Sequence, residues 1–334
     1  MANWFNYKVL FLLLIPLVLA GYRGEHKARR WGFFGHKRIN RIAIFTLPPE
    51  MFGFYKEHIE FLTEHAVDPD KRRYAVDGEA PRHYIDIDHY VEEGNDPFEI
   101  MPEDWDAAIE KFTEDTLQAY GIVPWYLNVM KQKLTKAFES KNVDLILKYS
   151  ADIGHYIGDA HVPLHTTENY NGQLTDQKGI HGLWESRLVE VNDDNYDYYI
   201  GKAEYVEDVK SYFWEAIKGS HAAVDSVLTF EKTLTEEFDA DKKYSFEQRG
   251  TQTVKVYSKE FSDEYHMRLD GMVERRLRRS ILAVGSIWYT CWVDAGQPDL
   301  GALQNTPPSE ELLEEMKAVD DQYHDGKHKG RICE

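Results

Sequence analysis

Apolar residues recur at three- and four-residue spacing through most of the chain, and few segments alternate with a period of two. Three- and four-residue spacing gathers apolar side chains on one face of a helix. We find no internal repeat and no linker rich in glycine or serine. The pattern therefore predicts an all-α protein with a single multi-helical domain. The clearest helical stretches are 104–140, which is broken near Gly121 and Pro124, and 143–160, 205–228 and 261–293.

The first twenty residues have the composition of an export signal. Lys8 supplies a positive charge, and residues 9–20 form an apolar run that is short for a membrane span and typical of a signal peptide. We therefore predict a signal peptide at 1–20 and a secreted or periplasmic protein, with an uncleaved anchor as the alternative. Export would take Cys291 and Cys333 into an oxidising compartment, and the sequence leaves open whether they pair.

Composition excludes several classes of protein. Of the 334 residues, 43% are hydrophobic, which excludes wholesale disorder. Asp and Glu number 58 against 39 Lys and Arg, and the net charge of −19 opposes nucleic-acid binding by a broad basic surface. A small metal-neutralised phosphate site remains compatible with that charge. Two cysteines are too few for a disulfide framework or a cysteine-based zinc scaffold. Residues 301–334 are polar, and we expect a loosely held tail there.

Histidines and carboxylates concentrate in two motifs, HYIGDAHVPLH and HGLWE. His155 and Asp159 are four residues apart on a predicted helix, as are His181 and Glu185, and His165 lies just past the first helix end. Residues four apart share one helical face, a spacing that one metal ion can bridge. A single such pair is typical of a surface contact. Two pairs joined by a third histidine predict a metal site, and ligands without thiolates favour zinc at a hydrolytic centre.

Further candidate ligands lie upstream. His36 follows Trp31 by five residues at the start of a predicted helix, and Asp68 precedes His83 by fifteen. Asp70 is a rival to Asp68, which we prefer from its place after Ala-Val. Chemistry alone makes these residues plausible ligands, but a histidine at a helix start also fits a cap, and Asp-Pro-Asp also fits a turn.

In this order the motifs resemble one superfamily, which contains zinc-dependent bacterial phospholipase C and single-strand-specific fungal nucleases of the P1 and S1 type. GHKRINRIAI, HYIDID, HYIGDAHVPLH and HGLWE carry the resemblance from Trp31 to about Arg187, with a helical continuation to about Gly296. It implies an all-α catalytic domain over 31–300 with three zinc ions in a cleft. The implied ligands are Asp68, His83, His155 and Asp159 for the first ion, His165, His181 and Glu185 for the second, and Trp31, His36 and Asp159 for the third.

The resemblance also implies a processed N-terminus, because in this superfamily the first residue of the mature chain is the ligand equivalent to Trp31 and binds through its amine and carbonyl. Cleavage after Ala20 would leave ten residues before Trp31. A second cut is therefore required, and Arg29–Arg30 offers a site for a trypsin-like protease. We treat 21–30 as a possible pro-segment.

The implied reaction is hydrolysis of a phosphoester by a zinc-activated water, with Asp68 orienting or deprotonating that water. Glu185 and the short link between His165 and His181 place phospholipid ahead of single-stranded nucleic acid as substrate, and the nuclease or nucleotidase is the alternative. A non-catalytic zinc- or phosphate-binding protein is the rival from another class. No stable protein partner is implied, and a membrane would be contacted only as a substrate surface. The candidate substrate residues are Lys71, Arg72, Tyr84 and Asp86.

Overall fold

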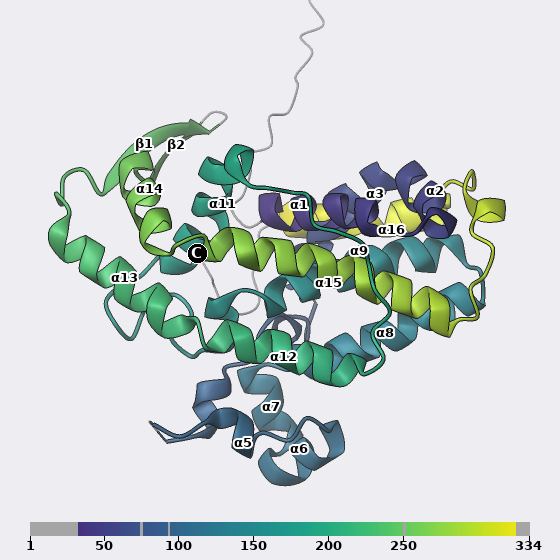
Figure 1. Cartoon of the computed structure of the whole chain (residues 1–334), viewed down its shortest axis with the longest axis horizontal. Helices are drawn as coiled ribbons and strands as arrows, with labels where there is room; N and C mark the ends of the chain where they lie inside the picture. Colours follow the sequence, from purple (N-terminus) through teal and green to yellow (C-terminus); the bar gives the residue numbers. More distant parts are fainter. Residues whose placement is uncertain (1–32, 74–75, 93, 250–251, 325–334) are drawn as a thin grey trace, which may run out of the picture.

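The computed structural model describes residues 33–324, except 74–75, 93 and 250–251 (Figure 1). The expected signal peptide, the pro-segment, Trp31 and Cys333 lie outside the described residues. No described helix is long and apolar enough to cross a membrane.

Four helices form the centre of the molecule. They are α1 (Phe33–Ala43), α8 (Val123–Glu139), α9 (Val143–Ala160) and α15 (Met272–Asp294). The longest, α15, contacts the other three and runs across the front of the molecule in Figure 1. Every residue of α9 from Ser150 to Ala160 is buried. The polar side chains at the C-terminal end of this helix therefore lie inside the protein, where they need partners.

Glycines on α9 allow α1 to approach it closely. A Cβ atom at Gly154 would lie 2.0 Å from Asn40 Oδ1, and one at Gly158 would lie 2.9 Å from His36 Nδ1. Such separations are shorter than atoms tolerate, so side chains at these two positions would force the helices apart. This close packing brings His36 of α1 beside Asp159 of α9.

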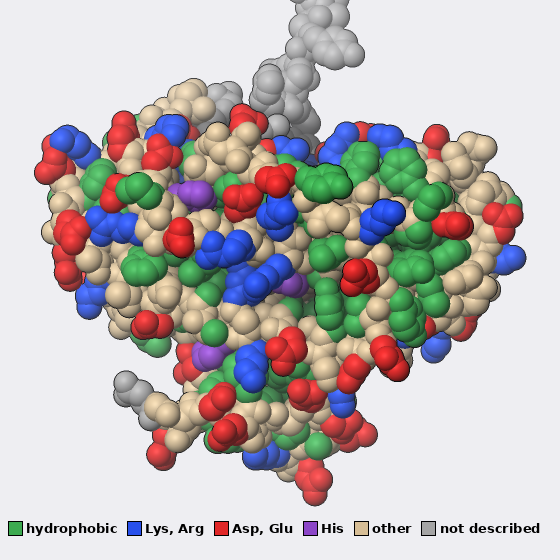
Figure 2. Space-filling model, viewed as in Figure 1, with side chains coloured by type: hydrophobic (Ala, Val, Ile, Leu, Met, Phe, Trp, Pro, Cys, Tyr) green, Lys and Arg blue, Asp and Glu red, His purple; other side chains and the backbone are tan. Residues whose placement is uncertain are grey.

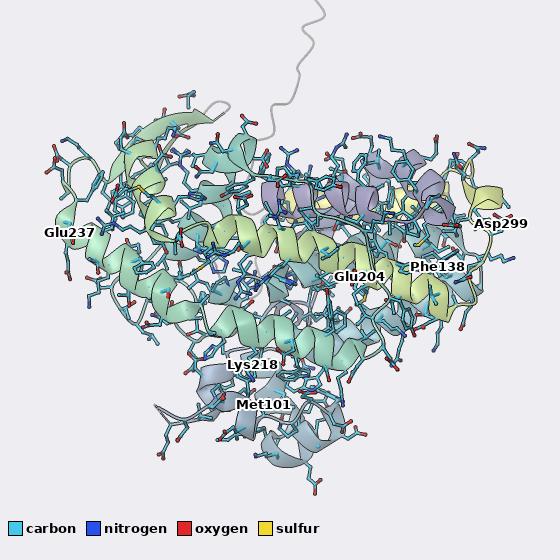
Figure 3. The ribbon with its side chains drawn as sticks, in the orientation of Figure 1. Met101, Phe138, Glu204, Lys218, Glu237 and Asp299 are labelled. Atoms are coloured by element: carbon cyan, nitrogen blue, oxygen red, sulfur yellow. The ribbon has the colours of Figure 1, made fainter. Side chains whose placement is uncertain are left out.

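Shorter helices surround this centre, and α5, α6 and α7 project from one side of it (Figure 1). Glu237 and Asp299 lie at opposite ends of the long axis (Figure 3). The remaining helices are α2 (Pro49–Glu57), α3 (Ile59–Glu64), α4 (Asp68–Arg73), α5 (Pro97–Ile100), α6 (Trp105–Phe112), α7 (Glu114–Tyr120), α10 (Ile180–Gly182), α11 (Leu188–Asn192), α12 (Val209–His221), α13 (Val224–Glu237), α14 (Lys259–Arg268) and α16 (Glu310–His324).

One antiparallel hairpin interrupts the helices between α13 and α14. It pairs β1 (Tyr244–Arg249) with β2 (Gln252–Tyr257), and Tyr244 lies opposite Tyr257. The helical periodicity does not predict it. The signal for the hairpin is a brief alternation of side chains over 244–247 and 253–256, too short to stand out beside the longer helical patterns.

The expected all-α class is confirmed, with differences in detail. The predicted helix over 143–160 has the observed bounds, whereas the stretch 261–293 is two helices separated at Gly271, whose φ of 69° suits glycine. The loosely held tail expected from residue 301 is a correction, because residues 310–324 form α16. This helix buries Leu312, Met316 and Tyr323, and it packs against α4. Its apolar positions recur at helical spacing within an otherwise acidic stretch.

Candidate metal centre

Three neighbouring groups of histidines and carboxylates lie between α1, α9 and the turns that follow them. Within each group the potential ligand atoms lie within 4.8 Å of one another. Two of the groups share His155, and the third is joined to them through short contacts. They consist of His36, His155 and Asp159; Asp70, His83 and His155; and His165, His181 and Glu185.

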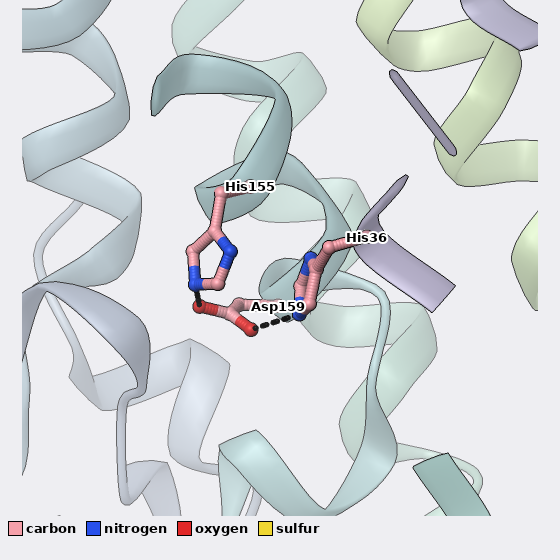
Figure 4. Close-up of side chains that lie close together, drawn as sticks. All are labelled: His36, His155 and Asp159. Carbon is pink, nitrogen blue, oxygen red and sulfur yellow. Dashed lines mark ion pairs between the residues drawn. The ribbon is translucent and has the colours of Figure 1, made fainter. Parts of the chain in front are cut away.

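Asp159 is the hub of these groups. One oxygen lies 2.9 Å from His83 Nδ1 and 3.3 Å from His155 Nε2, and the other lies 3.4 Å from His36 Nε2 (Figure 4). The same oxygen that faces His36 is 3.6 Å from His165 Nδ1. A single carboxylate can thus serve two neighbouring cation positions, one through each oxygen. This geometry is compatible with the bridging role that the resemblance implied for Asp159.

The third group forms around a π-helical turn, Leu183–Arg187, which directly follows α10. Glu185 Oε2 lies 2.7 Å from His181 Nε2 and 3.5 Å from His165 Nε2, and its other oxygen lies 3.3 Å from His36 Nε2. His165 itself comes from a 3-10 turn, Pro163–Thr166, that begins after α9 ends. The contact between Glu185 and His36 connects this group to the one around Asp159.

The expected ligand Asp68 is a correction to the sequence analysis. Its carboxylate accepts hydrogen bonds from His65 Nδ1 at 2.6 Å and from Lys71 Nζ at 2.7 Å, so both oxygens are occupied. Asp70 joins the group instead, because its Oδ1 lies 3.6 Å from His155 Nε2 and 3.8 Å from His83 Nδ1. Both aspartates lie on the first turn of α4, where residues two apart point in different directions. Sequence position alone does not separate them.

Backbone carbonyls orient three of the histidines. Nδ1 of His155, His165 and His181 lies 2.9, 2.6 and 3.1 Å from the carbonyl oxygens of Ala66, His83 and Tyr170. A neutral ring that donates from Nδ1 carries a lone pair on Nε2.

These lone pairs face one another inside the group. His165 Nε2 and His181 Nε2 are 3.2 Å apart, and His155 Nε2 is 3.1 Å from His83 Nδ1. For His165 and His181, whose Nδ1 atoms both lie on carbonyls, two lone pairs at that distance repel unless a proton or a metal ion lies between them. No carbonyl of the described residues fixes the tautomer of His83, so its Nδ1 can instead donate to His155. The residues present therefore fit a metal ion, with distal hydrogen bonds of the kind that orient metal-binding histidines.

Burial and neighbouring histidines shift the pKa values of two carboxylates in the site. Burial raises the pKa of Asp159, but the positive charge that His155 and His165 carry when protonated outweighs burial and holds that pKa well below its usual range. Burial likewise raises the pKa of Glu185, and hydrogen bonds from His165 and His181 lower it further than burial raises it. Both carboxylates thus stay ionised inside the protein. Buried anions of this kind need cations beside them.

The four candidate substrate residues are held within the protein. Lys71 Nζ bridges Asp68 and Asp320, at 2.7 and 2.6 Å. Arg72 donates to Asp152 at 2.9 Å. Tyr84 and Asp86 are buried. A role of these side chains in substrate binding stays a prediction.

Sequence reasoning missed Glu79. This buried residue accepts a hydrogen bond from the Tyr156 hydroxyl, and its Oε1 lies 4.0 Å from Nε2 of His83. It stands behind His83 on the side away from Asp159. Glu79 and His83 are four residues apart, like His155 and Asp159, but with the carboxylate first. This interval is the sequence signal that could have identified Glu79.

Comparison with known proteins gives one family. The model of the S1/P1 Nuclease family matches residues 31–282, which is well over half of the chain. No curated protein matches the chain. Nucleases of this family use zinc to hydrolyse phosphodiesters, and the match spans all the histidine and carboxylate groups described above. The chain therefore belongs to the S1/P1 nuclease family and is a phosphodiester hydrolase.

Proposed function

We propose that the protein is a secreted zinc-dependent nuclease that cleaves single-stranded nucleic acid. The observation that carries the proposal is the contiguous set of buried histidines and carboxylates around Asp159, within a chain that matches the S1/P1 nuclease model over 31–282. Secretion is supported by the sequence of residues 1–20. The rival interpretation, a non-catalytic zinc protein, predicts separate closed four-coordinate sites, whereas two of the three groups here share His155.

The order of substrates changes from the sequence analysis. Phospholipid stood first there, but the family match favours the nuclease alternative. Phospholipase C activity remains the second candidate, because Glu185 and the short link from His165 to His181 favour it.

The structure supports a specific distribution of ligands for three ions. Asp70, His83, His155 and one Asp159 oxygen would hold the first, and His165, His181 and Glu185 the second. His36 and the other Asp159 oxygen would hold the third, together with the amine and carbonyl of Trp31 if the chain is cut there. Asp70 replaces Asp68 in this proposal.

Bound zinc ions would supply Lewis-acid chemistry, lowering the pKa of a water and neutralising phosphate charge. The chain's own carboxylates divide the remaining work. Asp159 is 1% exposed, so its two oxygens face the surrounding histidines and the proposed ions and not bulk water. Asp70 is 20% exposed, which makes it the group carboxylate most open to solvent and the best placed to accept a proton from water. Asp68, tied to His65 and Lys71, fixes the start of α4 instead.

Parallel assays test the proposal. Protein beginning at Trp31 is incubated with single-stranded DNA, double-stranded DNA and phosphatidylcholine, each with and without a chelator. We expect rapid, chelator-sensitive cleavage of single-stranded DNA. Asp239→Asn, at an exposed surface ion pair with Lys242, is the matched control and should leave the rate unchanged. Hydrolysis of phosphatidylcholine with single-stranded DNA intact would establish the second candidate, and zinc binding without any hydrolysis would establish the non-catalytic reading.

The N-terminus is tested by comparing chains that begin at Gly21 and at Trp31. An amide nitrogen is a poor zinc ligand because its lone pair is delocalised into the carbonyl. A terminal amine can release its proton to a metal. We expect the longer form to hold less zinc and to react more slowly. Equal zinc content and equal rates would show that the amine is dispensable.

A further inference from the structure

A groove runs between the β-hairpin and the segment 178–183, which contains α10 and lies next to the metal centre. Its volume is about 330 Å³, and both strands and this segment line it. The hairpin lies at the upper left of the molecule in Figure 1, beside α14 and near α11. None of its residues belongs to the three ligand groups.

Aromatic and basic side chains share one face of the hairpin. In the register of the two strands, Tyr244 lies opposite Tyr257, and Phe246 lies opposite Lys255. Alternate residues of a strand point to the same face, so these four side chains form one surface. The rings of Tyr244 and Tyr257 are 5.0 Å apart, and Lys255 Nζ lies 3.8 Å above the ring of Tyr244.

Phe246 extends this surface into solvent, since 75% of the residue is exposed. Lys178, on the facing segment, is also exposed, as is Lys255. Exposed aromatic rings beside lysines are the combination that binds single strands, where bases stack on the rings and cations follow the phosphates. In a chain with a net charge of −19, two lysines flanking one groove give a local site for an anionic strand.

The same segment of the chain contributes to one wall of the groove and to the metal centre. The segment 178–183 that forms one wall carries His181, whose Nε2 lies 2.7 Å from Glu185. Arg187, at the end of the same π-helical turn, donates to Glu247 of β1 at 2.6 Å and ties the hairpin to this turn. At Gly182, on the groove wall, a Cβ atom would meet open space.

A second basic cluster, on α15, is engaged elsewhere. Figure 2 shows Lys and Arg side chains gathered near the middle of the face, over the helix that contains ERRLRRS. Arg278 donates to the backbone of residues 197 and 199, Arg275 donates to the carbonyl of Asp270, and Arg276 is buried against Ser220. These arginines hold the tertiary structure, whereas the hairpin groove is open.

We propose that this groove binds a stretch of single-stranded polynucleotide beside the metal centre. Bases stack on Tyr244, which lines the groove, and on Phe246, which lies outside the lining on the same face of the hairpin, and Lys178 and Lys255 contact the phosphates. The inference rests on the proposed nuclease function, because the groove would hold the part of the substrate strand that is next to the cleaved bond.

Binding of a fluorescent, phosphorothioate-linked single strand of about ten nucleotides tests the groove. Anisotropy is recorded over a series of salt concentrations with the zinc-loaded protein. We expect Phe246→Ala to weaken binding about tenfold, the effect of losing one stacked base. Lys178→Gln and Lys255→Gln should each lower the slope of log affinity against log salt by about 0.7. Lys136→Gln, an exposed lysine in the last turn of α8, is the matched control and should change neither quantity.

Two results would contradict the proposal that a single strand binds in this groove. One is wild-type affinity and salt slope in all three variants. The other is loss of binding to phosphatidylglycerol vesicles with oligonucleotide binding intact, which would make the hairpin a lipid-contacting surface. The substitutions are at exposed positions, and the lysine variants keep the test valid if Phe246→Ala fails to fold. Oligonucleotide binding in this groove without cleavage would contradict only the proposed nuclease function. Cleavage with an unchanged KM in the variants would contradict only the proposal that the groove binds the strand.

Discussion

Replacing Asp159 by asparagine should have the largest effect of any single substitution in the metal centre. Asparagine keeps the shape of the side chain but removes the negative charge that faces His36, His83 and His155. Loss of a residue that only orients a metal ligand typically costs 10- to 100-fold in metal affinity. Asp159 is proposed to be a direct ligand of two ions, so we expect at least about 100-fold for each, or ~2.7 kcal/mol per ion. Hydrolysis should fall by about a thousandfold.

The assay compares the zinc content of Asp159→Asn with its rate on single-stranded DNA. Asp193→Asn is the matched control, because Asp193 is also a buried carboxylate and is held by Arg38 and Tyr198. That variant should lower the free energy of unfolding without removing zinc, since Asp193 belongs to none of the ligand groups. The pair therefore separates loss of metal from general destabilisation.

Several outcomes would contradict this reasoning. Wild-type zinc content in Asp159→Asn would show that the carboxylate does not bridge the ions. Normal zinc with a lost rate would make Asp159 an orienting residue and not a ligand. Loss of zinc from Asp193→Asn as well would mean that the centre responds to any weakening of the fold.

Three further predictions concern single residues. Asp70→Asn should remove zinc and activity, whereas Asp68→Asn should mainly destabilise α4; metal analysis of both variants decides between them. Gly154→Ala should lower the free energy of unfolding by about 1–3 kcal/mol in denaturant melts, because its Cβ would lie 2.0 Å from Asn40 Oδ1. Burial raises the pKa of the Cys291 thiol to about 12, so the folded protein keeps a proton that the unfolded chain loses near pH ~8.5. Stability should be unaffected below that pH and should fall as the pH rises above it, and iodoacetamide should label Cys291 only after unfolding.

The all-α class and the helix over 143–160 could be predicted because helical periodicity is a local property of the sequence. The hairpin at 244–257 could not, because its alternating pattern is brief and its strands are stabilised by packing that is distant in the chain. Tyr257 stacks near Phe261, and Arg187 reaches Glu247 from outside the hairpin. Similarly, α16 was hidden in an acidic stretch, since its few apolar residues become informative only once α4 is placed against them.

Within the candidate metal centre, some residues could be predicted from the sequence and others could not. His155 with Asp159 and His181 with Glu185 were predictable because each pair is defined by one helical turn, whatever the rest of the fold does. The choice between Asp68 and Asp70 depends on a different relation, the rotation of α4 about its own axis relative to α9. That rotation is set by contacts such as Lys71 with Asp320 of α16, which lies 249 positions further along the chain (320 − 71). The packing of a short helix therefore decides which of its residues can be a metal ligand. Local spacing narrows the candidates to Asp68 and Asp70, but it does not distinguish between them.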